Sequence, residues 1–386
     1  MTPAAESAVD EALRAGRAIL KFISRNDVGD TGGHQCGYYL PKHSWEIFTD
    51  IPPEKGTTST KDVRITWGNG QQTDSSLKWY GRGKSEYRLT KFGRGFSYLD
   101  KDNVGSLLVL IPHDFANYSA YVLDFDDDIE GVQTALGLEI VGTVAVFEKG
   151  VVLAETEDAC VDRKFRSFIS SMEAFPKARL LSDSTREAMI DCIRSFQSAN
   201  PDRRLLRLVQ EEYRLFRMLE RKLAEPEVTR LFKDIEDFIS VAQSLLQRRK
   251  GRAGLSFQNH FQDILTEEKI PHDAQPDIEG LPDFVIPSVE AYKDKSYPTD
   301  RLLILGLKTT CKDRWRQVLE EGPRVPRKHI VTLQQGISVS QLLKMKKSNV
   351  SLVVPKDYHN NYDVGASGIE LLSVAQFISS TREKLY

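Results

Sequence analysis

The chain has 386 residues, of which 40% are hydrophobic and 28% are charged, a composition typical of a globular protein long enough for two domains. Its formal net charge of −2 excludes a uniformly basic surface, so any site for DNA must be a local patch. The four cysteines form no CxxC pair, which predicts a reduced, cytoplasmic protein without structural zinc or a disulfide framework.

The first 40 residues predict a helix followed by a loop. Small and apolar side chains recur at helical spacing over residues 6–24, and the amphipathic, acidic residues 1–20 are not a signal peptide. No apolar run in the chain approaches the roughly 20 residues of a membrane helix, so we expect no membrane contact. Residues 26–37 (NDVGDTGGHQCG) are typical of either an anion-binding nest or a simple turn.

Short strand-like runs separated by glycine-containing turns predict a small barrel or sandwich between residues 62 and 123. Residues 78–94 alternate Lys and Arg with Trp, Tyr and Phe, which favours a nucleic-acid-binding surface. A strand edge protected by charge explains the same pattern equally well. The acidic run at residues 124–128 lacks the spacing of a calcium loop, and we interpret it as a solvated turn.

From about residue 160 the pattern becomes helical, so we place the domain boundary at residues 155–180. Pro201 begins one helix and Pro226 a second, which residues 248–254 (RRKGRAG) are expected to break. After a further helix, a mixed α/β sheet is predicted from strands beginning at residue 283, ending at residue 308, and spanning residues 329–333 and 350–354, with a closing helix near residues 370–384.

Three ionisable residues can converge at one end of this sheet. Lys308 ends a buried strand, Asp283 precedes another, and Glu321 lies on a helix predicted over residues 313–321. Two carboxylates that bind Mg²⁺ and a lysine that faces water or phosphate are the minimum for phosphodiester hydrolysis. In the usual PD-(D/E)XK pattern the residue two positions before the lysine is acidic, whereas Gly306 stands there. A surface ion-pair network is the alternative interpretation.

Several motifs resemble the EcoRII family of restriction endonucleases. The resemblance to the family's catalytic domain is carried by residues 308–317 (KTTCKDRWRQ), 333–336 (LQQG), 353–355 (VVP), 248–250 (RRK), 252–254 (RAG) and 282–284 (PDF). The resemblance to its N-terminal effector domain is carried by residues 26–27 (ND), 31–35 (TGGHQ), Gly37, Glu86, Arg88 and 93–95 (GRG). The motifs occur in the same order as in the family and span both domains.

The resemblance implies two domains. Residues 1–170 would form a mainly β DNA-binding pseudobarrel, and residues 180–386 an α/β restriction-endonuclease-like PD-(D/E)XK fold. It also implies a type II restriction endonuclease that cleaves double-stranded DNA at a short G/C-flanked site with Mg²⁺. Such an enzyme would work as a homodimer in the cytoplasm, and its N-terminal domain would bind effector DNA and regulate cleavage.

The resemblance further assigns roles to individual residues. Asp283 and Glu321 would hold Mg²⁺, and Lys308 would position or polarise the attacking water. The triplet Lys312, Asp313 and Arg314 would read G·C pairs, because Lys and Arg donate to guanine and a carboxylate accepts from cytosine. Effector DNA would contact His34, Tyr39, Arg82, Lys84, Glu86 and Arg88. Tyr292 has a counterpart near the family's active site, although we favour a core tyrosine.

The sequence departs from the family at several positions. Gln258 and Gln262 replace glutamates on the helix after residues 252–254, which removes negative charge near the metal. Residues 208–210 (LVQ) replace an arginine run, and Tyr87 stands where a lysine is expected. Gly306, Gln258 and Gln262 leave open a DNA-binding protein that has lost cleavage, and residues 208–210 leave the centre of the recognition sequence open. A cysteine-nucleophile enzyme at Cys311 is disfavoured because no histidine lies nearby in the sequence.

Overall fold

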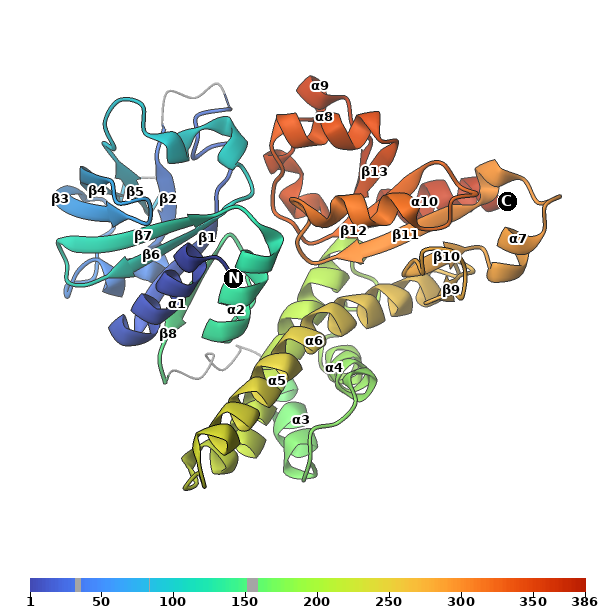
Figure 1. Ribbon diagram of the computed structural model, residues 1–386, viewed down its shortest axis with the longest axis horizontal. Coiled ribbons are helices and arrows are strands. Elements are labelled where there is room, and N and C mark those ends of the chain that lie inside the picture. Colours follow the sequence, from blue (N-terminus) through green and yellow to red (C-terminus); the bar gives the residue numbers. More distant parts are fainter. Residues whose placement is uncertain (32–35, 83, 151–158) are drawn as a thin grey trace. The chain divides into compact units, whose positions relative to one another are not determined.

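The computed structural model describes residues 1–31, 36–82, 84–150 and 159–386, and the candidate residue His34 lies outside them. The chain divides into two compact units, coloured along the sequence in Figure 1. The first unit comprises Met1–Gly150, Gln334–Lys344 and Tyr358–Gly368, and the second comprises Val151–Leu333, Met345–Asp357 and Ile369–Tyr386. No helix in the described part of the chain is long and apolar enough to span a membrane.

The first unit is built on a mainly β, barrel-like sheet, as predicted. Its eight strands follow the order β2-β5-β4-β3-β7-β6-β1-β8, and only the β3–β7 pair is parallel. The strands are β1 (Arg17–Phe22), β2 (Tyr38–Pro41), β3 (Thr58–Trp67), β4 (Gln72–Tyr80), β5 (Glu86–Thr90), β6 (Leu107–Pro112), β7 (Asn117–Leu123) and β8 (Val144–Glu148). Short 3-10 helices connect some of them: η1 (Lys42–Ile47), η2 (Ser97–Leu99) and η3 (Lys101–Asn103).

Both faces of this sheet are partly buried. Successive side chains of a strand point to opposite faces, so one strand contributes residues to both cores. Leu108 and Leu110 belong to one hydrophobic core, while Leu107 and Val109 belong to a second core beneath α1 (Pro3–Ala15) and α2 (Asp126–Leu136) (Figure 1). The first core is the interior of the barrel-like sheet. The sheet therefore separates an enclosed core from a helix-covered one.

The sequence prediction of one helix over residues 6–24 is wrong beyond Ala15. Gly16 ends α1 with a φ of 75°, a left-handed conformation that favours glycine. The next residues form β1, where Ile19 and Leu20 face different cores and pair with both β6 and β8. Burial on both faces of this strand explains the apolar residues that resembled a helical pattern.

The acidic run at residues 124–128 is not a solvated turn. Asp126 and Asp128 lie in the first turn of α2 and are buried. The two carboxylate oxygens of Asp128 accept hydrogen bonds from the backbone N and the Oγ1 of Thr2, each at 2.6 Å. Carboxylates at a helix N-terminus also interact favourably with the helix dipole. The run therefore joins the starts of α1 and α2.

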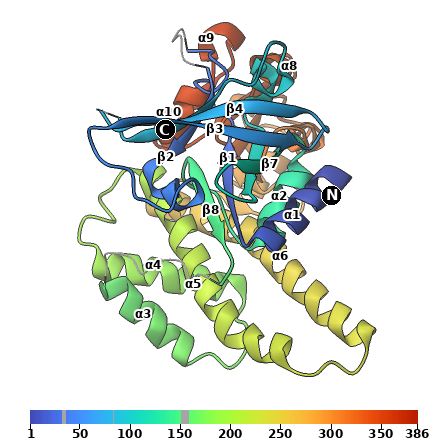
Figure 2. The ribbon, with the colours of Figure 1, turned by 90° about the vertical axis from the view of Figure 1, so that its left-hand side faces the viewer.

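The second unit begins with four helices, α3 (Ala159–Ser170), α4 (Ala178–Cys192), α5 (Pro201–Thr229) and α6 (Ile235–Glu267). The long helices α5 and α6 lie side by side (Figure 2). Two predicted boundaries are wrong, because α5 continues through Pro226 and α6 continues through residues 248–254. Arg252 is buried with its guanidinium 5.0 Å from the ring centre of Tyr213. This packing keeps the segment helical where the sequence predicted a break.

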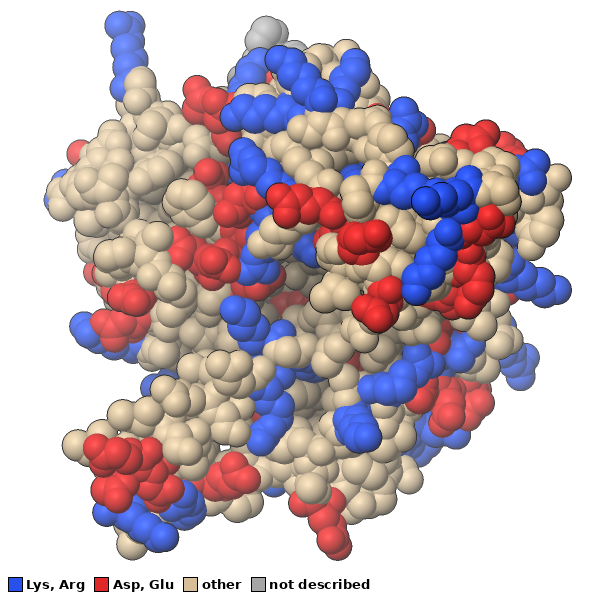
Figure 3. Space-filling model, turned by 45° about the vertical axis from the view of Figure 1, so that its right-hand side comes forward, with Lys and Arg blue, Asp and Glu red and all other residues tan. Residues whose placement is uncertain are grey.

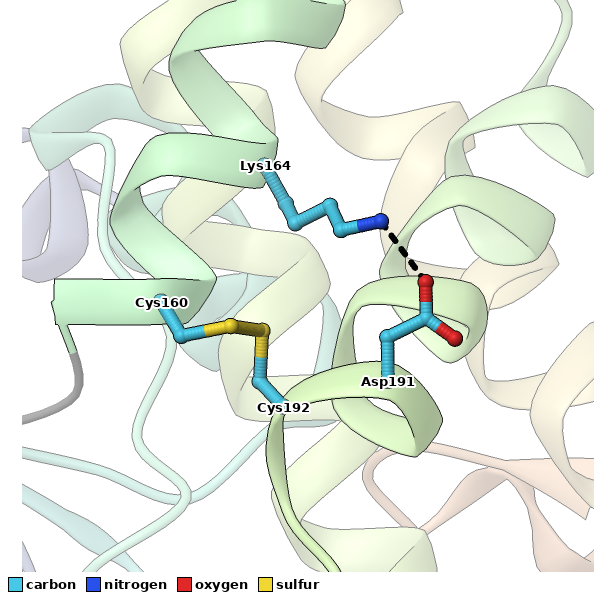
Figure 4. The surroundings of a disulfide bond; sticks show 4 residues. All are labelled: Cys160, Lys164, Asp191 and Cys192. Atoms are coloured by element: carbon cyan, nitrogen blue, oxygen red, sulfur yellow. Dashed lines mark hydrogen bonds and ion pairs between the residues drawn. A yellow bond between two sulfur atoms is a disulfide. The ribbon is translucent and has the colours of Figure 1, made fainter.

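The prediction of fully reduced cysteines is also wrong in the structure. A disulfide joins Cys160 at the start of α3 to Cys192 at the end of α4, with a Cα–Cα distance of 5.6 Å (Figure 4). Beside it, Lys164 Nζ and Asp191 Oδ2 lie 2.7 Å apart and link the same two helices. The two cysteines are 32 residues apart in the sequence, and the packing of α3 on α4 brings them together.

The predicted mixed α/β sheet forms the rest of the second unit. Its order is β14-β13-β12-β11-β10-β9, in which β11 to β14 are parallel and β9 and β10 are antiparallel to their neighbours. The strands are β9 (Asp273–Ala274), β10 (Phe284–Ile286), β11 (Leu303–Lys308), β12 (Lys328–Thr332), β13 (Val350–Val353) and β14 (Leu371–Leu372). The remaining helices are α7 (Val289–Lys293), η4 (Thr299–Arg301), η5 (Arg314–Glu320), α8 (Val339–Lys347), η6 (Lys356–Asn361), α9 (Val364–Ser367) and α10 (Val374–Leu385).

Candidate active site

The neighbouring strands β10 and β11 bring Asp283 and Lys308 together. The antiparallel pairing of Phe284 with Leu305 places Asp283, which precedes β10, beside the end of β11. The Asp283 carboxylate accepts a hydrogen bond of 2.6 Å from the backbone N of Leu307, and the same oxygen, Oδ2, lies 3.9 Å from Lys308 Nζ. The Asp283 and Lys308 side chains are 27% and 18% exposed, so solvent and ligands can reach both.

Glu321 approaches the same place from a different element. The predicted α-helix over residues 313–321 is instead the 3-10 helix η5, and Glu321 follows its last residue. A Cβ atom at Gly306 would lie 3.2 Å from Glu321 Oε2 and only 2.4 Å from Cγ1 of Val318. The Glu321 carboxylate therefore occupies the space above the strand position where the usual pattern has an acidic residue, and that position has to be glycine.

One oxygen of the buried Glu321 carboxylate is available to bind a cation. Glu321 is 7% exposed, and its Oε2 is buried without a hydrogen-bond partner. Burial raises the pKa of Glu321 to about 7; the charges of Lys308 and Lys328 oppose the shift, and that of Asp283 adds to it. A cation between Asp283 and Glu321 would favour the ionised form of both carboxylates.

The donor set suits a hard divalent cation with few protein ligands. Mg²⁺ is usually held by one or two carboxylates together with waters and substrate phosphates. In the described ranges of the chain, three or more His, Cys, Asp or Glu side chains do not gather anywhere in a metal-binding group. The pair Asp283 and Glu321 therefore fits Mg²⁺ and does not resemble a closed structural metal site.

Gln258 on α6 is connected to this pair through one residue, Gln275. Its Oε1 accepts a hydrogen bond of 3.3 Å from Gln275 Nε2, and the backbone N of Gln275 donates to the backbone O of Asp283 at 2.8 Å.

Tyr292 is 5% exposed in a hydrophobic cluster, and its hydroxyl donates to Glu279 Oε2 at 3.1 Å. This location agrees with the interpretation of Tyr292 as a core tyrosine.

The three candidate base-reading residues differ in accessibility. Lys312 is 1% exposed, whereas Asp313 and Arg314 at the start of η5 are half-buried. Cys311 is completely buried, as expected for a packed residue between a strand and a helix. Contact between Lys312 and a base would require its surroundings to move.

In the first unit, the candidate DNA-contacting residues lie on β2, on β5 and in the turn before β5. Tyr39 pairs with Arg88 across these strands, and Arg88 Nε donates to Glu86 Oε1 at 3.0 Å. Glu86 and Arg88 are buried, whereas Arg82 and Lys84 are exposed. On the face of the molecule drawn in Figure 3, basic and acidic side chains are interspersed.

Three of the four aromatic residues between these basic residues are buried and cannot stack on bases, whereas Tyr80 is half-buried. Trp79, Tyr87 and Phe92 are 1%, 5% and 6% exposed and belong to the enclosed core of the sheet. The alternation along residues 78–94 is therefore that of strands with one face in a core. Sequence reasoning also missed Lys21 and Asp27, a fully buried ion pair of 2.9 Å whose carboxylate accepts from the backbone N of Tyr39 at 2.8 Å.

Known proteins match the chain over almost its whole length. The family model "Restriction endonuclease EcoRII, N-terminal" matches residues 15–149, and the model "EcoRII C terminal" matches residues 216–378. The chain is 30% identical over 379 residues to the type II restriction enzyme EcoRII of Escherichia coli, which covers 93% of this chain and 92% of that enzyme. The type II restriction enzyme SsoII of Shigella sonnei is 27% identical over 132 residues, covering 31% of this chain and 42% of SsoII.

Two solved structures of restriction endonucleases in complex with DNA align with part of the chain. Metal-depleted Ecl18kI in complex with uncleaved, modified DNA aligns with 57% of this chain and 83% of that chain, at 22% identity and a TM-score of 0.46. The PspGI–substrate DNA complex aligns with 55% of this chain and 93% of that chain, at 15% identity and a TM-score of 0.46.

Proposed function

The chain belongs to the EcoRII family of type II restriction endonucleases, and from this premise we propose that it hydrolyses both strands of DNA at a short G/C-flanked site, with Mg²⁺ as cofactor. The observation that carries the proposal is the convergence of Asp283, Lys308 and Glu321 from three different elements at one edge of the second sheet. A surface ion-pair network would not explain why one oxygen of the Glu321 carboxylate, Oε2, is buried without a hydrogen-bond partner.

Each of the three residues has a distinct role in the proposed reaction. Asp283 and Glu321 would hold Mg²⁺, which, when bound, stabilises charge on the phosphate and lowers the pKa of the attacking water. The backbone N of Leu307 fixes the Asp283 carboxylate in place. Lys308, whose ammonium lies 3.9 Å from Asp283 Oδ2, would orient the water or a phosphate oxygen beside that carboxylate.

The direct test is incubation of the purified chain with unmethylated plasmid DNA and Mg²⁺, followed by mapping of the ends. We expect discrete fragments with a common terminal sequence, and none when EDTA replaces the metal. Random degradation would contradict site specificity, and discrete fragments in EDTA would contradict the cofactor. The same experiment identifies the recognition sequence and the position of the cut.

The second candidate function is sequence-specific DNA binding without cleavage. Gly306 no longer supports it, because Glu321 supplies the carboxylate above that position. Gln258 remains in its favour, because an amide cannot provide the negative charge of the family's glutamate. DNA that is bound at one sequence and recovered intact in Mg²⁺ would establish this alternative.

Gln258→Glu is expected to lower the Mg²⁺ concentration needed for half-maximal cleavage. The substitution adds a carboxylate next to Gln275, whose backbone N donates to Asp283. Added ligand charge strengthens the binding of a hard cation. Cleavage rates should be measured over a Mg²⁺ titration, with Gln262→Glu, one turn further along α6, as the matched comparison. An unchanged titration for Gln258→Glu would show that this residue does not influence the metal.

DNA recognition is proposed to involve both family domains, taken as residues 1–170 and 180–386. In the second, Asp313 and Arg314, and Lys312 once uncovered, would read G·C pairs. In the first, effector DNA would contact His34, Tyr39, Arg82, Lys84, Glu86 and Arg88. The exposed Arg82 and Lys84 suit phosphate contacts, whereas Glu86 and Arg88 are buried as a pair and would have to be uncovered before DNA reaches them.

We also propose that the N-terminal domain restrains cleavage until effector DNA binds. Two segments within the C-terminal family match, Gln334–Lys344 and Tyr358–Gly368, belong to the same compact unit as Met1–Gly150. Arg25 pairs with Asp363 at 2.5 Å, and Gln334 Nε2 donates to the backbone O of Gly105 at 3.0 Å. Effector binding would favour an open state by acting on these contacts.

Asp363→Asn should cut a plasmid with a single recognition site faster than the wild-type chain does. The amide still accepts from the backbone N of Ala366 at the start of α9 but loses the charge that attracts Arg25. Because the Arg25–Asp363 ion pair is half-exposed, we expect the rate of plasmid cleavage to rise by about 2- to 5-fold. Asp30→Asn is the control, because Asp30 pairs with the same Arg25 inside the N-terminal region.

An oligonucleotide carrying the site should accelerate the wild-type chain more than the Asp363→Asn chain, because the variant is already partly released. If neither the oligonucleotide nor the substitution changes the rate, the N-terminal domain only targets the enzyme to DNA. Intact chains are required for this comparison. A fragment without residues 1–170 would leave Gln334–Lys344 and Tyr358–Gly368 without their packing partner.

We propose that the active enzyme is a cytoplasmic homodimer. One chain provides one Asp283–Lys308–Glu321 site, and a cut through both strands needs two, which a two-fold dimer on a two-fold symmetric sequence supplies. The DNA that such an enzyme cleaves is found in the cytoplasm. Sedimentation of the chain with its oligonucleotide should give the mass of two chains on one duplex, and a complex of one chain per duplex would contradict the dimer.

A further inference from the structure

Lys328, the first residue of β12, is a buried lysine close to the candidate active site. It is 3% exposed, and its Nζ donates hydrogen bonds to the backbone O of Gly322 at 2.8 Å and of Val325 at 2.6 Å. A buried ammonium is unfavourable unless such acceptors satisfy it. The two acceptors belong to the turn that begins immediately after Glu321.

Several contacts hold this turn in one conformation. The backbone N of Val325 donates to the backbone O of Gly322 at 3.0 Å, so this oxygen accepts both from the turn itself and from Lys328. The backbone N of Gly322 donates to the backbone O of Glu279 at 2.7 Å. Gly322 has a φ of 48°, and Ile304 of β11 leaves no room for a side chain beside it. Lys328 thus binds both ends of the turn from inside the protein.

The turn determines the position of the Glu321 carboxylate. The side chain lies over Gly306, next to Leu307, whose backbone N donates to Asp283, and its Oε2 has no hydrogen-bond partner that would hold it there. Its placement therefore depends on the backbone at residues 321–325. Burial lowers the pKa of Lys328, and the nearby charge of Glu321 opposes this shift, so the two groups also interact electrostatically.

We propose that Lys328 is a positioning residue that fixes the Glu321 carboxylate opposite Asp283 by holding the carbonyl groups of Gly322 and Val325. The inference rests on the proposed metal-dependent cleavage and deepens it. Lys328 itself does not contact DNA or metal in this role, because its ammonium is directed at the two backbone oxygens. It differs in this respect from Lys308, whose ammonium lies beside Asp283 on a half-buried side chain.

Lys328→Met tests the proposal, because methionine fills similar space and donates no hydrogen bond. Residues that orient metal ligands typically change metal affinity by about 10- to 100-fold when replaced. We expect Ca²⁺, titrated into the full chain by calorimetry, to bind about 10-fold more weakly. The Mg²⁺ dependence of cleavage should shift in the same direction. The melting temperature, measured in parallel, reports the loss of stability separately.

Lys222→Met is the matched control. Lys222 Nζ donates to the backbone O of Ile169, Ser170 and Met172, so its replacement also removes a lysine from backbone carbonyls of the second unit. It should lower the melting temperature and leave Ca²⁺ binding unchanged. If Lys328→Met shows the same behaviour as this control, with wild-type Ca²⁺ affinity, Lys328 is only structural and the proposal is overturned.

A second variant covers the case in which Lys328→Met does not fold. Gly322→Ala strains the same turn through its positive φ without changing any charge, and it should weaken Ca²⁺ binding in the same direction. Wild-type Ca²⁺ affinity in that variant would overturn the proposal. A wild-type chain that binds no metal and cuts no DNA would instead overturn the proposed function itself.

Discussion

Lys308→Ala should abolish DNA cleavage while leaving sequence-specific binding within a few-fold of wild type. The Lys308 ammonium lies beside Asp283 at the edge of the sheet, where we propose that it acts on water and phosphate and not on a base. Single-turnover cleavage in Mg²⁺ and gel-shift titrations in Ca²⁺ measure the two properties separately. Lys293→Ala, an exposed lysine of α7 in the same unit, is the control and should retain both. Cleavage near the wild-type rate by Lys308→Ala would show that the active site lies elsewhere.

Asp283 needs a more conservative variant, because its carboxylate also accepts from the backbone N of Leu307. Asp283→Asn keeps an oxygen for that hydrogen bond and removes the charge required for Mg²⁺. We expect it to lose cleavage with little change in melting temperature, whereas Asp283→Ala should lose both cleavage and some stability. Active Asp283→Asn would exclude this carboxylate as a metal ligand.

Arg314→Ala should weaken specific DNA binding by about 1–3 kcal/mol, with the loss concentrated at G·C positions of the site. Arg314 begins η5 just after the strand that carries Lys308, so recognition and chemistry would be connected through six residues of chain. Dissociation constants for oligonucleotides with single base-pair changes locate the position that it reads.

Arg316 provides the comparison for Arg314, because it is exposed and its guanidinium lies 4.9 Å from the ring centre of Trp315. Arg316→Ala should change binding to all sequences by a similar small factor. If Arg314→Ala also loses affinity equally for related and unrelated sequences, Arg314 contacts phosphate and not a base.

The sequence predicted best where one physical factor dominates. The apolar run before Lys308 forms β11 because it is buried between neighbouring strands, and a run of that kind has few alternatives. Asp283 could be placed near Lys308 for the same reason. The helix ends were harder, because packing overrides local signals: aromatic contacts of Arg252 support α6 through a stretch that looked like a break.

The features of the candidate site that depend on tertiary packing could not be predicted from the sequence. Spacing suggested that Glu321 replaces the strand carboxylate, but only the fold shows that it lies over Gly306. Nothing in the sequence around Lys328 indicates that its ammonium holds the turn after Glu321. The aromatic residues between basic residues 78 and 94 were ambiguous, since a strand facing a core and a stacking surface for bases use the same residue types.

The glycine at position 306 also limits how such a site can change over evolutionary time. Moving the carboxylate from the turn back to the strand would require at least two coordinated substitutions. An acidic side chain at position 306 collides with Val318 and with the Glu321 carboxylate, and loss of Glu321 alone would leave the proposed cation one ligand short. Every single-step intermediate is therefore worse than either end point. Once a lineage has adopted the arrangement with Gly306 and Glu321, it is expected to keep it, and the two residues should be inherited as a pair.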